Sequence, residues 1–474
     1  MAKASLKKNF FYKGLLTLAN PIMGMVTFPY VSRVLGVENI GLVNFVDNTV
    51  SYFLLFATMG IGTLGVRAIA TANKTKEDLN RTFSNVFGLN LLFTCSVLLV
   101  YNLLVFTVPG FRDYSELFYI GNAKILFSSL LIEWFFNGIE NFKYITIRSL
   151  LVRFIYVISI FLFIKCSGDY KLYFSLTVLV TVVNALINLI YSRRFVQIVP
   201  KYLISKRFLR ENIKLGIYAI MTSMYLTFNV MFLGLNTNNI EVGYYTSAYK
   251  LYHLILSVFG AFSSVMLPRM SALIAENNND QFACLINKSM EFVAMFSIPL
   301  ILCCSIMAPE IIYLLCGSGY EGAILPMRII MPALIVVGMS HVLAMQVLVP
   351  QNKDNVLLKA SVIGAVLSLI VNVLLVDKFQ SIGSAIVLLV SETSLTLTYL
   401  WYILSHRIIR INYSVFVRYA LTALPSAAVC VLTKVYIDNP IISLVIAVCF
   451  GVLMYVVINL KHIQKMLNIK SFKI

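Results

Sequence analysis

The chain has 474 residues, of which 59% are hydrophobic and 12% are charged. Soluble domains carry roughly 25% charged residues and about half apolar residues, so a water-soluble fold of this length is excluded. In a soluble protein, the net charge of +18 would favour nucleic acid as a partner. In a membrane protein, the cations instead indicate the orientation of the chain, through the loops in which they lie. The composition therefore predicts an all-α, polytopic membrane protein without a nucleic-acid partner.

The N-terminal segment MAKASLKKNFFYKG is basic and leads directly into the first apolar stretch. A secretory signal peptide has a short apolar region and a cleavage site of small residues. The stretch here is long and has no such site, so we expect it to be retained as the first helix.

A bilayer core needs about 20 mainly apolar residues per helix. Fourteen segments meet this length, in chain order 11–32, 42–66, 83–107, 117–137, 146–166, 172–192, 213–234, 242–266, 289–315, 323–348, 357–376, 382–404, 414–436 and 440–460. The first and the tenth are the least uniformly apolar. An even number of spans places both termini on the same side of the membrane.

The distribution of lysines and arginines between the loops indicates on which side of the membrane the termini lie. Of the 38, 29 lie on the side of the termini and eight on the other, while Lys250 lies inside a span. The positive-inside rule makes the first side cytoplasmic. The sequence thus predicts a multi-pass protein with both termini in the cytoplasm, and most of the net charge is explained without any partner.

No loop is long enough for a folded domain. The longest, 193–212, is basic and amphipathic, and we expect it to lie on the cytoplasmic membrane surface. It divides the chain into a six-helix lobe (1–192), the linker (193–212), a second six-helix lobe (213–405) and two further helices with a basic tail (406–474). A shift of 202 residues aligns the hydropathy of the two lobes, although the identities it produces are at the level of chance. Such duplication is common in transporters.

Two of the predicted spans have a polar face. In 242–266, residues at helical spacing are small or polar on one side: Gly243, Ser247, Lys250, His253, Ser257 and Ser264. Tyr245, Tyr249 and Tyr252 lie on the other side. Span 42–66 places Asp47 and Asn48 on such a face. Because ionisable groups inside a span face a cavity or another helix, we expect these polar faces to line a cavity.

Lys250 lies eight residues beyond Val242, roughly 12 Å into its span. Its own face is polar over several turns, which favours a functional charge facing a cavity. The alternative is a lysine that reaches back to the interface among tyrosines, or one that pairs with another helix, for example through Asp47.

For the other ionisable residues in the predicted spans, a role in a cavity is likewise weighed against a position between helices or at the interface. Lys124 is a cavity candidate, whereas Glu133 lies on another face of the same span and is expected to be interhelical or interfacial. Glu392 and Asp47 are candidates for a proton or ion site. Arg33 is either a cavity cation or an anchor at the outer interface.

Four more arginines lie at predicted cytoplasmic helix ends, where the positive-inside bias is the alternative to substrate binding: Arg67, Arg148, Arg153 and Arg269. The sequence has no phosphate-binding loop and no paired carboxylates in a long outer loop. Its four histidines are scattered, and its eight cysteines have no metal-binding spacing. We therefore predict no enzymatic activity, no metal, no cofactor and no disulfide framework.

Four stretches resemble Wzx-type polysaccharide flippases of the MOP superfamily, which also contains the MATE exporters. They are NPIMGMVTFPYVSRVLGVENIGLVNF, EWFFNGIENFKYITIRSLLVRF, VGYYTSAYKLYHL and GSGYEGAILPMRIIMPAL, and the resemblance runs from about residue 8 to 405. It implies two six-helix lobes around a central cavity, with two extra C-terminal helices.

The resemblance also implies a function. Such a protein translocates an undecaprenyl-pyrophosphate-linked oligosaccharide from the cytoplasmic to the periplasmic leaflet of the bacterial inner membrane, by alternating access coupled to an ion gradient. A polysaccharide polymerase and chain-length proteins are the implied protein partners. The cationic cavity of the family corresponds here to Lys250, Arg33 and Arg148.

Two other functions are alternatives to the flippase, and the sequence fits each of them less well. A MATE-like drug/cation antiporter needs an acidic cavity, whereas span 242–266 carries a lysine. A membrane polymerase or ligase needs large outer loops to hold donor and acceptor, and the predicted outer loops are short.

Overall fold

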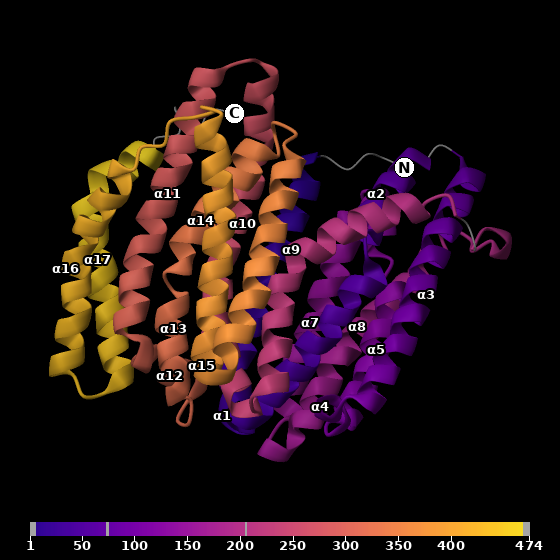
Figure 1. Ribbon diagram of the computed structural model, residues 1–474, viewed down its shortest axis with the longest axis horizontal. Coiled ribbons are helices and arrows are strands. Elements are labelled where there is room, and N and C mark those ends of the chain that lie inside the picture. The colour runs from indigo at the N-terminus through magenta and orange to yellow at the C-terminus, as the bar shows by residue number, and fades with distance from the viewer. Residues whose placement is uncertain (1–5, 73–74, 204–205, 468–474) are drawn as a thin grey trace. The chain divides into compact units, whose positions relative to one another are not determined.

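The computed structural model describes residues 6–72, 75–203 and 206–467, and every regular element in these ranges is helical. This confirms the predicted all-α class. Contacts divide the chain into two compact units, residues 1–242 and 243–474 (Figure 1). The lobe and linker boundaries predicted above stay a prediction. Four of the cations counted on the cytoplasmic side, Lys3, Lys74, Lys470 and Lys473, lie outside the described residues.

The first unit contains nine α-helices and two short 3-10 turns within the described ranges. They are α1 (Leu6–Thr58), α2 (Ile61–Ala72), α3 (Lys76–Thr107), α4 (Pro109–Arg112), α5 (Ser115–Leu130), α6 (Glu133–Gly138), α7 (Phe142–Phe163), η1 (Ser167–Asp169), α8 (Tyr170–Ser192), η2 (Pro200–Tyr202) and α9 (Leu209–Asn236).

The long helix α1 is broken at Gly36, which separates the predicted spans 11–32 and 42–66. Gly36 has φ 77°, a left-handed conformation that glycine adopts without the steric cost of a Cβ atom. A second break at Met59, with φ 38°, separates α1 from α2. Helix α1 therefore joins span 11–32 to most of span 42–66, and the second of these spans is interrupted at Met59 where a continuous helix was expected.

The predicted span 117–137 is wrong as a continuous helix, because α5 ends at Leu130 and α6 begins at Glu133. Between them Ile132 has φ 39°. A break inside the bilayer leaves carbonyl groups that need other donors. Two asparagine side chains supply them: Asn188 donates to the Leu131 carbonyl, and Asn90 donates to that of Ser129 at 3.3 Å.

An aromatic core lies beside this break. Phe83, Trp134, Phe135 and Phe136 from α3 and α6 are buried and form one cluster with α2. Gly65 of α2 lets the Trp134 ring approach closely, since a Cβ atom there would lie 2.6 Å from the ring. This core fixes the short helices α2 and α6 against α3.

The second unit begins at Gly243, within α10 (Asn239–Ala275). Its other described elements are α11 (Asn279–Ile306), α12 (Ala308–Cys316), η3 (Glu321–Ala323), α13 (Ile324–Ile330), α14 (Ala333–Val342), a π-helix η4 (Leu343–Leu348), α15 (Asp354–Ser405), α16 (Ser414–Tyr436) and α17 (Pro440–Leu467).

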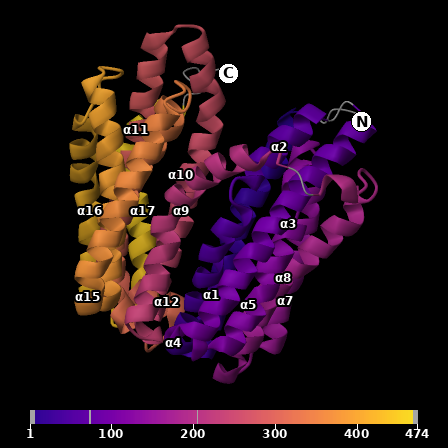
Figure 2. The same cartoon turned by 45° about the vertical axis from the view of Figure 1, so that its right-hand side comes forward.

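Breaks also interrupt the long elements of this unit. Helix α15 is broken at Gln380, with φ 51°, between the predicted spans 357–376 and 382–404. The predicted span 289–315 is divided between α11 and α12, and span 323–348 between α13, α14 and η4. Helices α16 and α17 lie side by side in both views (Figures 1 and 2) and pack on α11 through the buried rings of Tyr419 and Tyr455.

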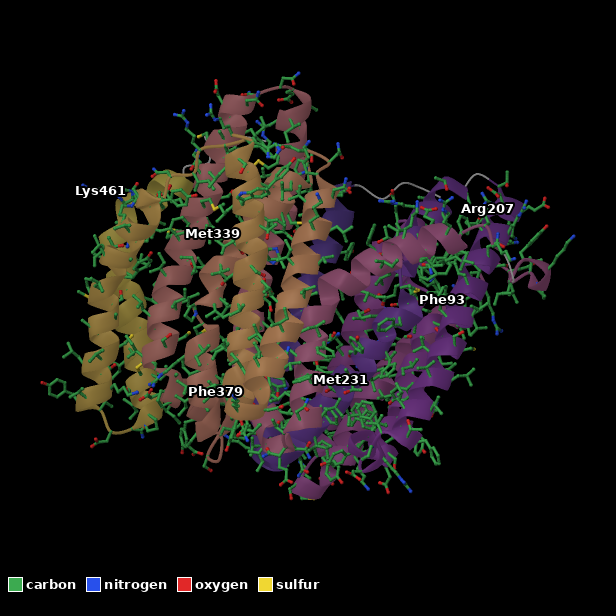
Figure 3. The ribbon with its side chains drawn as sticks, in the orientation of Figure 1. Phe93, Arg207, Met231, Met339, Phe379 and Lys461 are labelled. Atoms are coloured by element: carbon green, nitrogen blue, oxygen red, sulfur yellow. The ribbon has the colours of Figure 1, made fainter. Side chains whose placement is uncertain are left out.

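The outer faces of the helices are apolar. Leu99, Phe106 and Val435 are among many large apolar side chains with more than half of their surface exposed. Phe379, labelled in Figure 3, has half of its surface exposed. Water does not favour such a surface, whereas lipid does. Among the described residues, ten helices are long and apolar enough to cross a membrane, and two of them, Ile22–Ala72 and Asp354–Ser405, each cover two predicted spans. The chain is a multi-pass membrane protein, and the count of fourteen spans stays a prediction.

Candidate functional site

An ion pair lies inside the first unit. Lys124 Nζ on α5 is 2.5 Å from Asp47 Oδ1 on α1. Asp47 has 36% of its side chain exposed and Lys124 has 17%. Each residue therefore neutralises the other in a largely apolar surrounding, where a single charge would be costly.

Two tyrosines and an arginine extend this pair. Tyr156 on α7 and Tyr173 on α8 are hydrogen-bonded through their hydroxyl groups, and the charge of Asp47 acts on both. The charge of Arg153 acts on Tyr156 as well. We call Asp47, Lys124, Arg153, Tyr156 and Tyr173 the polar cluster of the first unit. Neither tyrosine was singled out in the sequence, since a tyrosine in an apolar span gives no sign of its partner.

Asn48 follows Asp47 but bonds within its own helix. Its Nδ2 donates to the carbonyl of Asn44 at 2.8 Å, within the same helix. Asn48 is half-buried, and this bond satisfies one of its two amide hydrogens. Its place on the predicted polar face stays a prediction.

A second ion pair links α6 and α7. Arg148 Nη2 donates to Glu133 Oε1 and to Ser149 Oγ, each at 2.7 Å, and Arg148 Nη1 donates to the carbonyl of Asn184 at 3.4 Å. Arg148 is only 5% exposed. The expectation that Glu133 is interhelical is confirmed by this pair. For Arg148, substrate binding stays a prediction.

Helix α10 carries Lys250, whose side chain is half-buried. Ser247, one turn earlier, is 1% exposed, while His253, one turn later, is exposed and lies with its ring 5.7 Å from that of Tyr249. Tyr245 and Tyr252 are 1% exposed. The tyrosine face of α10 is thus buried, and the polar face becomes more accessible toward His253.

Glu392 lies near this part of α10. It is buried on α15 at 5% exposure, and its charge acts on Tyr249. Tyr249 is the neighbour of Lys250 in sequence. The second unit therefore holds an acidic group and a cationic group on two helices, close to the same tyrosine.

The remaining predicted arginines have varied surroundings. Arg33 is exposed on α1, three residues before the break at Gly36. Arg67 is exposed on α2. Arg269, at the end of α10, is half-buried and donates through Nη2 to Gln281 Oε1 at 3.4 Å. Their roles in substrate binding stay predictions.

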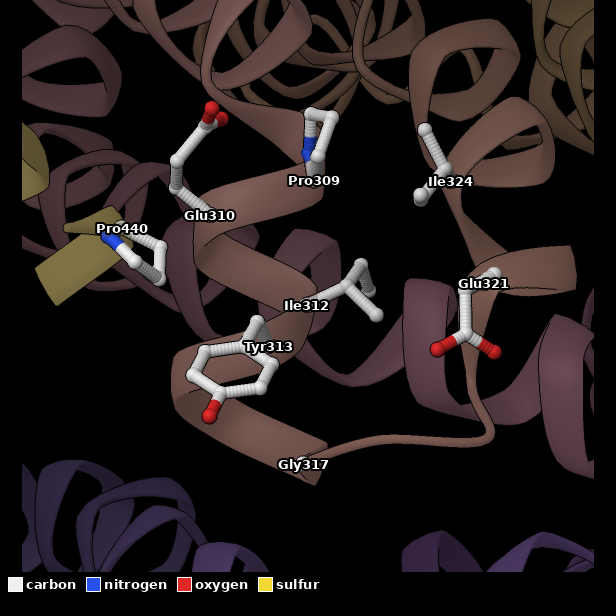
Figure 4. A pocket seen from close by; sticks show the side chains of 8 residues that line it. All are labelled: Pro309, Glu310, Ile312, Tyr313, Gly317, Glu321, Ile324 and Pro440. Atoms are coloured by element: carbon white, nitrogen blue, oxygen red, sulfur yellow. The ribbon is translucent and has the colours of Figure 1, made fainter. Parts of the chain in front are cut away.

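A cavity of about 250 Å³ lies in the second unit between α12, α13 and the start of α17 (Figure 4). Glu310 and Glu321 line it from α12 and η3. Glu310 Oε1 lies 3.4 Å from Lys434 Nζ of α16. Another pair, Glu291 with Arg418, joins α11 to α16. Neither pair was predicted, because residues so distant in sequence show no pattern that connects them.

Within the described residues, no group of three or more His, Cys, Asp or Glu could hold a metal ion. What the two units present is a set of charged side chains held inside apolar helices. Such an arrangement binds or moves ions and polar groups through a membrane and is typical of transporters.

The long broken helices and the intramembrane charges define a transporter-type membrane fold. Among solved structures, it is similar to the lipid II flippase MurJ in an inward closed conformation, with a TM-score of 0.78, 15% identity, and coverage of 97% of this chain and 100% of that one. It is also similar to an inward-facing multidrug resistance MATE family transporter of the MOP superfamily, with a TM-score of 0.64, 14% identity, and coverage of 83% and 98%. The chain therefore shares its fold with these two transporters.

The chain belongs to the family described as "Polysaccharide biosynthesis protein", whose model matches residues 6–274. A relative from Escherichia coli strain K12 named "Putative O-antigen transporter" is 24% identical over 414 residues, covering 86% of this chain and 99% of the relative. A relative from Haloferax volcanii named "Probable low-salt glycan biosynthesis flippase" is 26% identical over 250 residues, covering 52% and 53%. The resemblance to Wzx-type flippases is thereby confirmed.

Proposed function

We propose that this chain is a flippase that moves an undecaprenyl-pyrophosphate-linked oligosaccharide from the cytoplasmic to the periplasmic leaflet of a bacterial inner membrane, for surface polysaccharide biosynthesis. The family and the names of its relatives support the transport of a glycan on a lipid carrier. A polysaccharide polymerase and chain-length proteins would use the product on the outer side. Both termini lie in the cytoplasm in this proposal.

The observation that carries the proposal is Lys250, a half-buried cation on the polar face of an apolar helix. Placing a lysine at the centre of a bilayer costs about 2.5–3.5 kcal/mol on insertion scales, so such residues serve a purpose. A pyrophosphate that crosses the roughly 30 Å hydrocarbon core must exchange its water for other donors. An ammonium group offers charge-assisted hydrogen bonds to its oxygens.

Asp47 and Glu392 are the residues we propose for coupling to an ion gradient. A proton or cation bound at Asp47 would weaken its ion pair with Lys124 and thus change the link between α1 and α5. A proton or cation bound at Glu392 would likewise change the charge beside Tyr249. Binding that favours one conformation over another shifts their populations, which is the requirement for alternating access.

The alternative function is a MATE-like antiporter for cationic drugs, and the buried carboxylate of Glu392 is the observation that favours it. A cationic drug needs a net acidic site, however, and Asp47 is already neutralised by Lys124. Drug-resistance assays in an efflux-deficient strain distinguish the two functions, because the flippase confers no resistance.

Complementation tests the proposal most directly. In a strain that lacks its flippase and makes the matching lipid-linked glycan, the wild-type chain should restore surface polysaccharide. Lys250→Gln should abolish it, and Lys250→Arg should retain part, because the arginine keeps the charge. Lys359→Gln removes an equal charge at an exposed position of α15 and should have no effect.

Membrane levels of each variant are measured by immunoblot, so that loss of protein is separated from loss of transport. Normal polysaccharide from Lys250→Gln would overturn the role of this residue. Failure of the wild-type chain to move a labelled undecaprenyl-pyrophosphate oligosaccharide in proteoliposomes would overturn the function itself.

A further inference from the structure

A groove of about 640 Å³ lies between α7 and α8 of the first unit. Ligand sites commonly have about 300–1,000 Å³. The groove is apolar along most of its length and polar at one end, where Lys143, Tyr144, Arg148 and Tyr191 line it. It belongs to the outer surface of the unit and has no part in the polar cluster around Asp47.

One stripe of α7 forms the apolar wall. Ile147, Leu151 and Ile155 are four residues apart, so they lie on the same face of the helix. They are 44%, 58% and 62% exposed. Lys143, which is also exposed, precedes them by one further turn on the same face. The stripe therefore begins with a cation and continues with apolar side chains.

The polar end contains a donor without an acceptor. Arg148 is 5% exposed, and its Nη atoms bond to Glu133, Ser149 and the Asn184 carbonyl, but its buried Nε has no hydrogen-bond partner among the described residues. An unpaired donor on a buried guanidinium is costly. Glu133 offsets the positive charge of Arg148, and Lys143 adds a further, exposed cation at this end of the groove.

Two aromatic rings also line the polar end of the groove. Tyr144 and Tyr191 are stacked with their centroids 4.0 Å apart. The guanidinium of Arg194 lies over the Tyr191 ring, 5.4 Å from its centroid. Tyrosines and cations at one end of an apolar surface are typical of the membrane interface, where lipid phosphates lie.

The length of the groove fits one leaflet. Twelve residues separate Lys143 from Ile155, which is about 18 Å along a helix. Half of the hydrocarbon core is about 15 Å thick. A smaller cavity of about 80 Å³ continues past Val152 and Ile155 to Ser159. A chain as long as an undecaprenyl tail would extend far beyond this surface, whereas an acyl chain matches it.

We propose that the α7–α8 groove binds an anionic phospholipid of the cytoplasmic leaflet, with its phosphate at Lys143 beside the Arg148 guanidinium and one acyl chain along Ile147, Leu151 and Ile155. Basic pockets between membrane helices on the cytoplasmic side are suited to anionic headgroups. The proposal uses the predicted orientation of the chain and is independent of its cargo.

Native mass spectrometry of the full chain in mild detergent tests the proposal by titration with phosphatidylglycerol, phosphatidylethanolamine or undecaprenyl phosphate. We expect phosphatidylglycerol to bind at least about fivefold more tightly than phosphatidylethanolamine. Lys143→Gln should weaken phosphatidylglycerol about fivefold, since one cation near an anionic surface contributes about that factor. Lys201→Gln, an exposed lysine outside the groove, should leave binding unchanged.

A second pair of variants tests the apolar wall. Leu151→Trp should fill the groove and lower phosphatidylglycerol occupancy, whereas Leu162→Trp, equally exposed on α7 but outside the groove, should not. Equal losses from the two lysine variants would overturn the proposal, because they would show a diffuse charge effect. Equal binding of the two phospholipids would also overturn it, as would displacement of phosphatidylglycerol by equimolar undecaprenyl phosphate.

Discussion

Lys124 Nζ lies 2.5 Å from Asp47 Oδ1 although the two residues are 77 positions apart in the chain. The pair joins α5 to α1 within the first unit and sits beside the hydrogen-bonded Tyr156 and Tyr173. The sequence suggests Asp47 as a partner of Lys250, whereas the structure pairs it with Lys124. Two residues predicted for one cavity are therefore each other's counter-ion.

Removal of one member of this pair should destabilise the first unit. Asp47→Asn or Lys124→Met leaves an uncompensated charge or an unpaired polar group in a mainly apolar surrounding. Fully buried pairs lose about 3–5 kcal/mol and exposed ones about 0–1. Because this pair is partly exposed, we expect about 1–3 kcal/mol, measured as a lower midpoint of thermal unfolding in detergent.

The double variant Asp47→Asn/Lys124→Met provides the control. It carries no unpaired charge, so it should be more stable than the sum of the two single effects predicts. Strictly additive effects would mean that the two side chains do not interact in solution.

The pair of Arg148 and Glu133 leads to a second prediction. Arg148→Lys keeps the charge but loses the planar group that bonds to Glu133, Ser149 and the Asn184 carbonyl together. We expect this variant to lose about 2 kcal/mol of stability. Arg112→Lys, at an exposed position of α4, should unfold like the wild type. A similar midpoint for both variants would show that the donor geometry of Arg148 is unimportant.

From hydropathy and charge, the sequence predicts where the long helices lie and which charged residues they contain. The apolar segments placed nearly every long helix, and the glycine at position 36 coincides with a bend between two predicted spans. The break at Ile132 could not be predicted, because isoleucine rarely adopts a left-handed conformation. It depends on donors from Asn90 and Asn188, which only the folded unit brings near.

In the candidate site, too, the sequence reveals the charged residues but not their partners. Charged residues in apolar spans are visible in the sequence, so Asp47, Lys124, Lys250 and Glu392 could be selected. Their partners could not be, since pairing depends on helix packing rather than on local pattern. Tyr156 and Tyr173 are the clearest example, because an apolar span accommodates a tyrosine without revealing what its hydroxyl contacts.

The linker after α8 gives a third prediction. The backbone nitrogens of Gln197 and Val199 donate to Asn80 Oδ1 and Ser84 Oγ of α3, each at 2.9 Å. A Cβ atom on Gly88 would lie 2.0 Å from the carbonyl oxygen of Leu203. Gly88→Ala should therefore displace the linker and speed its cleavage by trypsin several-fold, as measured by limited proteolysis.

Gly62→Ala is the matched control, because a Cβ atom there meets nothing within 4 Å. It should leave the cleavage rate unchanged. If Gly88→Ala were cleaved at the wild-type rate, the close contact with Leu203 would not hold the linker in place.

The π-helix η4 provides the last prediction. Gln346 is fully buried there, accepts from Ser289 Oγ of α11 at 2.7 Å and donates through Nε2 to Ser263 Oγ of α10 at 3.5 Å. Hydrogen bonds between membrane helices contribute about 0.6 kcal/mol on average and up to about 1.7. Gln346→Leu removes both bonds and leaves two hydroxyl groups to find other partners, so we expect a loss of about 1–2 kcal/mol.

Ser289→Ala removes only one of these bonds and should lose less stability than Gln346→Leu. The double variant Gln346→Leu/Ser289→Ala should then be no less stable than Gln346→Leu alone, since the serine hydroxyl that lost its acceptor is gone. Thermal unfolding in detergent measures the stability of all three variants.

Because π-helical turns are frequent at functional sites, transport by Gln346→Leu is measured at a temperature where the variant is folded. A transport defect of the folded variant would assign η4 to the mechanism as well as to the core.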